Sequence, residues 1–293
     1  MAKRVVPSML RPAILPLLAW GCIVGAGELS LEGNFVQGGL LEGKAPPGSR
    51  VEVDGEPVRV SPEGNFLVGF GRDAPERSRV RVSYPNGGSE IRDLQVGRRE
   101  YDIQRIAGLP PSKVTPPQRD LERIRRESVM VAKARQRDDP RTDFLTGFIW
   151  PAEGRISGVY GSQRILNGEP RRPHFGVDVA GPVGTPVVAP ADGVVTLAHP
   201  DMFYSGGTLV IDHGHRLSSS FLHLSRILVQ EGQRVRRGEP IAEIGATGRV
   251  TGAHLDWRMN LGEHRIDPQL LVGPMPDVAG AAAKRPAGGA VDP

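Results

Sequence analysis

The stretch Pro173-His174-Phe175-Gly176-Val177-Asp178 places an imidazole and a carboxylate four residues apart, in a segment whose apolar residues predict an extended strand. Alternate side chains of a strand lie on the same face. His174 and Asp178 are therefore expected on one face, with Gly176 between them adding no side chain. This spacing predicts that the two polar side chains lie close together.

A second stretch, Gly252-Ala253-His254-Leu255-Asp256-Trp257, pairs the same residue types. Strand alternation puts His254 and Asp256 on one face, while Leu255 and Trp257 point to the other. Two histidines and two aspartates are enough to hold a zinc ion and leave one position for water. The two stretches therefore predict a metal site.

The histidines are distributed unevenly along the chain. All seven lie between His174 and His264, and none lies in the first 173 residues. Histidine is the commonest side-chain metal ligand and the usual proton shuttle near neutral pH. His223, in Phe221-Leu222-His223-Leu224-Ser225, is a candidate for proton transfer. For the others we expect His213 to be either structural or a support for the metal ligands, His215 to be a turn residue, and His199 and His264 to lie on the surface.

Together these stretches resemble the lysostaphin-type, LytM-like zinc metallopeptidases, which cut the peptide cross-links of peptidoglycan. That family shows His-x-x-x-Asp, then a histidine in an Ala-His-Leu-Ser-like segment, then His-x-His. The resemblance covers about residues 149–272 and implies an open β-sandwich with zinc on one face. It implies zinc ligation by His174, Asp178 and the residue at the third ligand position, Asp256. It also implies that His223 and His254 are the catalytic histidines that do not bind the metal.

Asp256 stands where the family has histidine, which leaves three outcomes open. A carboxylate oxygen can bind zinc, but it adds negative charge, so a metal-bound water would be less acidic. The site could also hold an ion without activity, or hold none and only recognise peptide. We favour an active zinc endopeptidase acting on peptidoglycan peptide stems, because the other four residues remain.

Two alternatives to the enzyme are kept. One is a degenerate LytM-like module that binds peptidoglycan or activates another wall hydrolase, with envelope or division proteins as partners. The other is a carbohydrate-binding domain in which these residues coincide by chance. Asp256 is the residue that separates the first alternative from the enzyme.

Composition favours a mainly β chain of two domains. The chain has 293 residues, 38 of them Gly and 27 Pro, with 5% aromatic residues, which is typical of short strands and many turns. The net charge is +4, but Lys3, Arg4 and Arg11 lie in a segment expected to be removed. The other charges are interspersed, so we expect no nucleic-acid partner.

Residues 1–26 are predicted to be a signal peptide. Three basic residues precede or enter an apolar run that ends in Val24-Gly25-Ala26, a small-residue cleavage pattern. The run is too short to indicate a membrane span, so we expect no stable span after processing. The signal peptide indicates export, and we expect a periplasmic protein. Lipoprotein processing at Cys22, the only cysteine, and an uncleaved anchor are the alternatives.

Residues 34–106 show apolar alternation of period two, with turn signals at Asp54-Gly55 and Asn86-Gly87. This pattern predicts a small immunoglobulin-like β-sandwich that acts as a spacer or docking domain. Residues 107–147 are a predicted Pro-rich and helical linker. Its helix is expected from Thr115 to about Asp138, with a narrow apolar stripe that packs on one neighbouring domain.

Residues 148–273 form the predicted metallopeptidase domain, almost entirely of strands. Residues 164–172 are expected to be a loop. In the family such loops border the substrate groove, which makes Asn167 and Arg172 candidate groove residues. Residues 274–293 are rich in Ala and Gly and are predicted to be a disordered tail.

Overall fold

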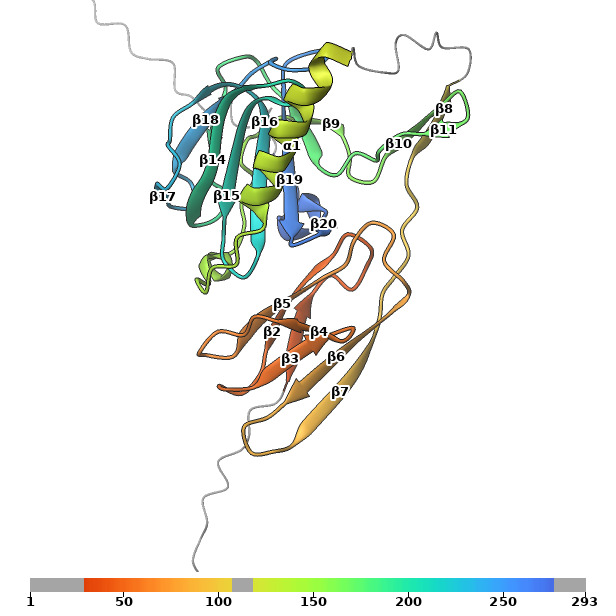
Figure 1. Cartoon of the computed structure of the whole chain (residues 1–293), viewed down its shortest axis with the longest axis vertical. Coiled ribbons are helices and arrows are strands. Elements are labelled where there is room, and N and C mark those ends of the chain that lie inside the picture. Colours follow the sequence, from red (N-terminus) through yellow and green to blue (C-terminus); the bar gives the residue numbers. More distant parts are fainter. Residues whose placement is uncertain (1–28, 107–117, 277–293) are drawn as a thin grey trace, which may run out of the picture.

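The computed structural model describes residues 29–106 and 118–276. The predicted signal peptide with Cys22, the helix start at Thr115 and most of the predicted tail lie outside these residues. The described chain is mainly β, with two β-domains and one α-helix (Figure 1). Among the described residues, no helix is long and apolar enough to cross a membrane.

The N-terminal domain is a sandwich of two antiparallel sheets, as predicted. Strand β2 lies between β1 and β5 in one sheet, and the second sheet has the order β4-β3-β6-β7. These strands are β1 (Ser30–Gly33), β2 (Leu40–Lys44), β3 (Arg50–Val53), β4 (Glu56–Val58), β5 (Asn65–Gly69), β6 (Arg77–Ser83) and β7 (Ser89–Gln95). Alternate residues such as Leu41, Phe66, Val80 and Val82 meet in one apolar core. The pairing of β2 with β5 and of β3 with β6 gives the crossed connections of immunoglobulin-like sandwiches.

The predicted turns form for the expected reason. Asp54 and Gly55 both adopt left-handed φ angles, 52° and 89°, which is the requirement of the tight hairpin between β3 and β4. Gly87 does the same in the β6–β7 connection, with φ of 86°. Each turn lies between strands whose alternation already indicated a hairpin.

The segment after the sandwich joins the second domain through a small sheet. Strand β8 (Ile103–Ile106) pairs in parallel with β10 (Gln163–Leu166), which forms a hairpin with β11 (Glu169–Pro170). The expectation of a loop over residues 164–172 was wrong. Asn167 and Gly168 take left-handed φ angles of 51° and 85°, and Asn-Gly is the strongest two-residue hairpin signal.

The C-terminal domain is built on an antiparallel sheet whose main path is β17-β14-β15-β16-β19-β12-β9. Strands β13, β18 and β20 pair off this path. Their bounds are β9 (Arg155–Gly158), β12 (Val177–Ala180), β13 (Pro186–Val188), β14 (Gly193–Met202), β15 (Gly206–Asp212), β16 (Leu217–Ile227), β17 (Arg234–Val235), β18 (Pro240–Ile244), β19 (His254–Leu261) and β20 (His264–Ile266). One face of the sheet buries a core that includes Phe221, Leu255 and Trp257. The opposite face carries the polar residues described below.

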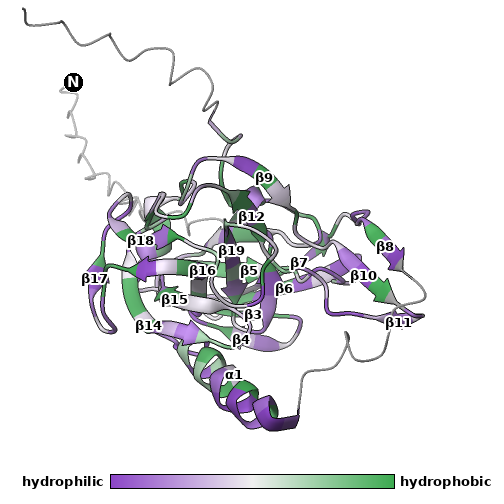
Figure 2. Cartoon of the chain, turned by 90° about the horizontal axis from the view of Figure 1, so that it is seen from above, coloured by the Kyte–Doolittle hydropathy of each residue, from purple (hydrophilic) through white to green (hydrophobic). Residues whose placement is uncertain are grey.

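Helix α1 (Leu121–Arg135) packs on the C-terminal domain over β14 and β15 (Figures 1 and 2). Val131 and Ala134 contact Leu197, Met202 and Val210 in a small apolar cluster. This confirms a narrow stripe packed on one neighbour. The helix follows a 3₁₀ turn, η2 (Gln118–Asp120), and ends three residues before Asp138. Two further 3₁₀ turns are η3 (Asp143–Thr146) and η4 (Pro268–Leu271).

The sandwich docks at the end of the C-terminal domain near β20 and η4. The Asp267 N–H donates to the Gly38 carbonyl at 2.8 Å, and the buried Asp267 carboxylate pairs with Arg99 at 2.8 Å. Asn34 donates from its side chain to the Leu270 carbonyl at 2.8 Å. Apolar contacts join them, since Leu40 and Leu67 of the sandwich belong to the same core cluster as Ile266.

Candidate metal centre

Two paired strands position the predicted cluster. Asp178 in β12 lies directly opposite Asp256 in β19 in the antiparallel register. Val177 and Val179 on β12, like Leu255 and Trp257 on β19, are fully buried in the core. The predicted alternation is therefore confirmed. Asp178 and Asp256, which lie between these buried residues, point to the opposite face.

His174, Asp178 and Asp256 come together on that face. One ligand atom from each lies within 4.8 Å of the others. His174 Nε2 is 3.0 Å from Asp178 Oδ1 and 3.5 Å from Asp256 Oδ2. His174 Nε2 and Asp178 Oδ1 are nevertheless buried without a hydrogen-bond partner among the described residues. They can bond to each other only when Nε2 is protonated. With a neutral ring, a nitrogen lone pair and carboxylate oxygens converge on one point, which is the donor set of a cation site.

The His174 ring is oriented by its other nitrogen. Nδ1 lies 3.2 Å from the Val159 carbonyl, and a backbone carbonyl can only accept a proton. Nδ1 therefore carries a proton and donates, which leaves Nε2 as the ring nitrogen that faces the two carboxylates. Burial by itself lowers the pKa of His174, but Asp178 and Asp256 outweigh it and raise that pKa to about 10. The raised pKa reflects a proton on Nε2, between the ring and the two carboxylates. A metal cation bound at this position would replace that proton.

His223 and His254 lie beside the cluster, with ring centroids 4.9 Å apart. His223 Nδ1 is 2.9 Å from the Thr247 carbonyl, and His254 Nδ1 is 2.9 Å from the Gly252 carbonyl. In both rings Nε2 is therefore the nitrogen left for contacts within the site. The Nε2 atom of His254 lies 3.9 Å from Asp178 Oδ1. Burial lowers the pKa of His223, so at neutral pH this imidazole is neutral and can accept a proton.

The backbone at His223 is unusual. Strand β16 pairs with β19 up to Leu222 and with β18 from Leu224 onward. His223 lies at the change of partner, with a left-handed φ of 66°. A side chain with that φ costs energy outside glycine, Asn and Asp, and such strain gathers at functional sites. The change of partner aims the ring out of the ladder and toward His254.

Arg258 is part of the site and was not predicted. It follows Asp256 by two residues, so both side chains lie on the same face of β19. Arg258 Nε donates to Asp256 Oδ1 at 2.9 Å, and Nη2 donates to Oδ2 at 2.5 Å. The Asp256 side chain is 4% exposed and that of Arg258 is 23% exposed. Burial would raise the pKa of Asp256, but Arg258 and His174 hold it well below its usual range.

Glycine at position 176 makes room for this pair. A Cβ there would lie 2.5 Å from Asp256 Oδ1 and 2.6 Å from Arg258 Cγ. A Cβ at Gly158 would collide in the same way with the Asp178 carboxylate. Gly176 was expected to add no side chain between His174 and Asp178. In the structure, the side chains of Asp256 and Arg258 occupy the space that this leaves.

The two candidate groove residues lie apart. Asn167 is at the tip of the β10–β11 hairpin. Arg172 lines a cavity of about 500 Å³ between α1 and the polar face of the sheet. The same cavity is lined by His223 and Arg258, which contact or flank the cluster, and it runs from them along α1. Arg172 is therefore near the cluster, whereas Asn167 does not line this cavity.

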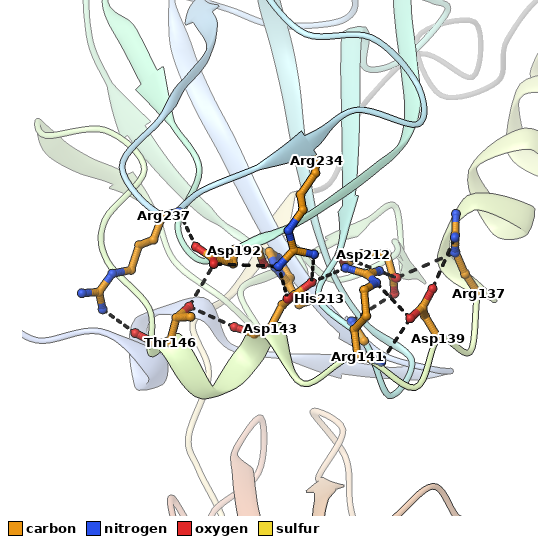
Figure 3. Close-up of polar contacts among 11 residues, drawn as sticks. Arg137, Asp139, Arg141, Asp143, Thr146, Asp192, Asp212, His213, Arg234 and Arg237 are labelled. Carbon is orange, nitrogen blue, oxygen red and sulfur yellow. Dashed lines mark hydrogen bonds and ion pairs between the residues drawn. The ribbon is translucent and has the colours of Figure 1, made fainter. Parts of the chain in front are cut away.

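His213 belongs to a separate buried polar network (Figure 3). Its Nδ1 lies 2.6 Å from the Asp192 carbonyl and its Nε2 2.6 Å from Ser219 Oγ. Burial lowers the pKa of His213 to about 4, so it is a neutral structural imidazole, as predicted. His215 lies in the β15–β16 turn with φ of 48°. His264 is exposed and His199 half-buried.

The network around His213 fixes the chain that follows α1. Arg141 pairs with both Asp143 and Asp212, and Arg234 donates to Asp143 at 2.7 Å (Figure 3). Asp143 and Asp212 are almost fully buried, and a buried charge is stable only when it is paired. The end of the linker is therefore held against the β15–β16 turn.

The fold and the cluster define a β-rich protein with a candidate metal centre of one histidine and two aspartates. Residues 172–268 match the sequence model of peptidase family M23. A crystal structure assigned to peptidase M23 from Pseudomonas aeruginosa is similar with a TM-score of 0.62 and 32% identity, over 80% of this chain and 94% of that one. This chain belongs to peptidase family M23.

Two curated relatives match about a third of the chain. Peptidoglycan DD-endopeptidase ShyA of Vibrio cholerae is 46% identical over 108 residues, which is 36% of this chain and 24% of that protein. The lipoprotein NlpD/LppB homolog of P. aeruginosa is 38% identical over 102 residues, 35% of this chain and 32% of that protein. The matched region is thus about a quarter to a third of the length of these relatives.

Proposed function

We propose that the chain is a zinc-dependent endopeptidase that hydrolyses peptide cross-links of peptidoglycan. The observation that carries the proposal is the convergence of His174 Nε2 and the carboxylates of Asp178 and Asp256, largely buried, on one face of the sheet. Imidazole nitrogen and carboxylate oxygen are both zinc ligands. The DD-endopeptidase name of ShyA supports peptidoglycan as the substrate.

The Asp256–Arg258 pair bears on the replacement of the family's third histidine. A lone aspartate would add one negative charge to the site. The guanidinium of Arg258 cancels that charge at hydrogen-bond distance, so the pair is formally neutral, as an imidazole is. This supports Asp256 as a third ligand that does not weaken the ion as a Lewis acid as much as a free carboxylate would.

His174, Asp178 and Asp256 would hold the ion, and a bound zinc supplies a polarised carbonyl and a water of lowered pKa. The neutral imidazole of His223 accepts a proton at Nε2 and passes it to the leaving amine. His254 Nε2, beside Asp178, is placed to accept a hydrogen bond from the attacking water and so to orient it. The carbonyls that bind both Nδ1 atoms keep these two rings in one orientation.

One observation favours a second function. Both oxygens of Asp256 already accept from Arg258, and a guanidinium that remained there would compete with a metal ion. In that case the groove would bind peptidoglycan peptides without cutting them, or activate another wall hydrolase. Envelope and division proteins would then be the partners. Under either function we place the protein in the periplasm, exported by the segment 1–26.

The test is digestion of purified peptidoglycan by the protein, with added zinc and with a chelator, followed by mass spectrometry of the released fragments. We expect new peptide ends that disappear with the chelator and with His174→Ala, and persist with His264→Ala, a control at an exposed histidine. Absence of new ends while the protein still sediments with the sacculi would reject the enzyme and favour the binding function.

A further inference from the structure

We propose that the cavity beside the cluster is an anion subsite that binds a carboxylate of the substrate peptide through Arg135, Arg172 and Arg265. The proposal rests on the proposed function, because it identifies the chemistry of the substrate at the same groove. It also assigns a substrate-binding residue, Arg135, to helix α1, which lies outside the matched family domain.

The cavity wall is strongly cationic. Five arginines line it, against two glutamates. Glu127 is committed elsewhere, since it accepts from Arg123 at 2.6 Å and from the Phe203 N–H at 2.8 Å. The other, Glu263, is exposed and lies outside ion-pair distance of any described basic residue. The wall therefore carries an excess of positive charge that the protein itself does not neutralise.

The arginines proposed to bind the anion have no carboxylate partner. Arg258 is paired with Asp256, but Arg135, Arg172 and Arg265 form no ion pair among the described residues. Arg135 and Arg265 are half-buried. Burial and the neighbouring arginines lower the pKa of Arg135 to about 9 and that of Arg265 to about 10. An anion placed among them would relieve this repulsion.

Neutral contacts orient these guanidinium groups. Arg135 Nε lies 3.3 Å from Ser220 Oγ, and Arg265 Nη1 lies 3.1 Å from Asn260 Oδ1. The guanidinium carbons of Arg172 and Arg265 lie 5.6 Å and 5.7 Å from the centroid of Phe175, the residue next to His174. Two of the three arginines thus lie against the ring of the residue that follows His174.

The planar fork of a guanidinium matches a carboxylate, which it can bind through two parallel hydrogen bonds. The cavity also reaches His223 and Arg258, so an anion bound there would belong to the same peptide whose amide lies at the cluster. A stem peptide carries free carboxylates, and a carboxylate is therefore the ligand to which we commit.

Helix α1 is fixed in place as one wall of this subsite. Its apolar stripe packs on Leu197, Met202 and Val210. Arg123 pairs with Asp201 at 3.0 Å near the start of the helix. After the helix, the network of Figure 3 anchors the chain at Arg141. A wall held at both ends can present Arg135 in one position without reorganisation when the peptide binds.

The experiment compares two stem peptides that differ only in a terminal carboxylate or carboxamide. Their binding to the full protein is measured by calorimetry in chelator, so that no turnover interferes. We expect the carboxylate peptide to bind about 10- to 100-fold more tightly, the value of a charge-assisted hydrogen-bonded pair. Arg135→Gln and Arg265→Gln should each remove most of this preference. Arg125→Gln, at an exposed arginine of the same helix, should retain it.

Equal binding of the two peptides by the wild-type protein would overturn the proposal, as would a preference that survives the double substitution Arg135→Gln, Arg265→Gln in a protein with an unchanged circular dichroism spectrum. Zinc-dependent release of peptides from sacculi is measured on the same samples. Release without a carboxylate preference would reject the anion subsite and keep the endopeptidase. A preference without release would do the reverse.

Discussion

Replacing Arg258 by Met tests whether the Arg258 guanidinium and a metal ion both stabilise the Asp256 carboxylate. Met retains the aliphatic stem, whose Cγ lies close to Gly176, but it removes the guanidinium. Two opposite charges about 4 Å apart attract by about 4 kcal/mol in the effective dielectric near a protein surface. Removing one partner of a buried pair typically costs about 3–5 kcal/mol. Because His174 still contacts Asp256 at 3.5 Å, we expect a loss of about 3 kcal/mol in the zinc-free protein.

With zinc bound, the ion supplies the positive charge that the guanidinium has lost. We therefore expect the same substitution to cost only about 1 kcal/mol in the zinc-loaded protein. The difference of about 2 kcal/mol must appear, by the thermodynamic cycle, as zinc binding that is about 30-fold tighter in the variant. Urea unfolding in chelator and in excess zinc gives the two stabilities, and competition with a chromophoric chelator gives the zinc affinity.

The matched control is Arg226→Met, which breaks an ion pair with Glu243 between strands β16 and β18. Arg226 is 63% exposed, so its loss should change the stability of either form little. If Arg258→Met costs the same with and without zinc, and leaves zinc affinity unchanged, then Asp256 does not bind the ion. That result would remove the third ligand from the proposed site.

Three further outcomes are expected. His223→Ala should retain stoichiometric zinc but lower turnover by about 10²- to 10⁴-fold, and unchanged turnover would exclude its catalytic role. Gly176→Ala should disrupt the Asp256 carboxylate and weaken zinc binding by at least 10-fold in titrations, because its Cβ would fall 2.5 Å from Oδ1; normal affinity would contradict the packing. The folded pKa of His213 is about 4, below its unfolded value of about 6.5. Its contribution to stability is therefore complete above pH 6.5 and lost as the pH falls toward 4, by up to about 3 kcal/mol. Urea unfolding should show a shallower loss in His213→Gln, and equal slopes would refute this assignment.

The fold was largely predictable because its signals are local. Strands of period two and Asn-Gly or Asp-Gly turns depend on neighbouring residues only, and β3, β6 and β7 form where those patterns predict them. The cluster was predictable for the same reason. His254 and Asp256 are two residues apart on β19, and His174 lies four residues before Asp178 of β12. These even spacings determine that the side chains share a face. The same Asn-Gly signal at Asn167 was available for the β10–β11 hairpin and was overlooked.

Arg258 was missed because it is not a metal-ligand type, although strand alternation from Asp256 would have placed it on the same face. Two other features depend on tertiary contacts. The left-handed φ of His223 arises where β16 changes partner from β19 to β18. The position of Arg135 beside the cavity depends on where α1 packs. The apolar stripe of the helix indicates only that it packs on one domain.

The departure at Asp256 is better understood as a change of two residues than of one. A histidine at this position would need no charge partner, and Arg258 would then be a cation on the polar face without a carboxylate. Conversely, an aspartate without Arg258 would leave two carboxylates facing His174. In the proposed zinc site the pair would keep the charge of the third ligand position at zero, and Gly176 provides the space that both side chains occupy. Asp256 and Arg258 on β19 and Gly176, two residues after His174, therefore form one structural unit.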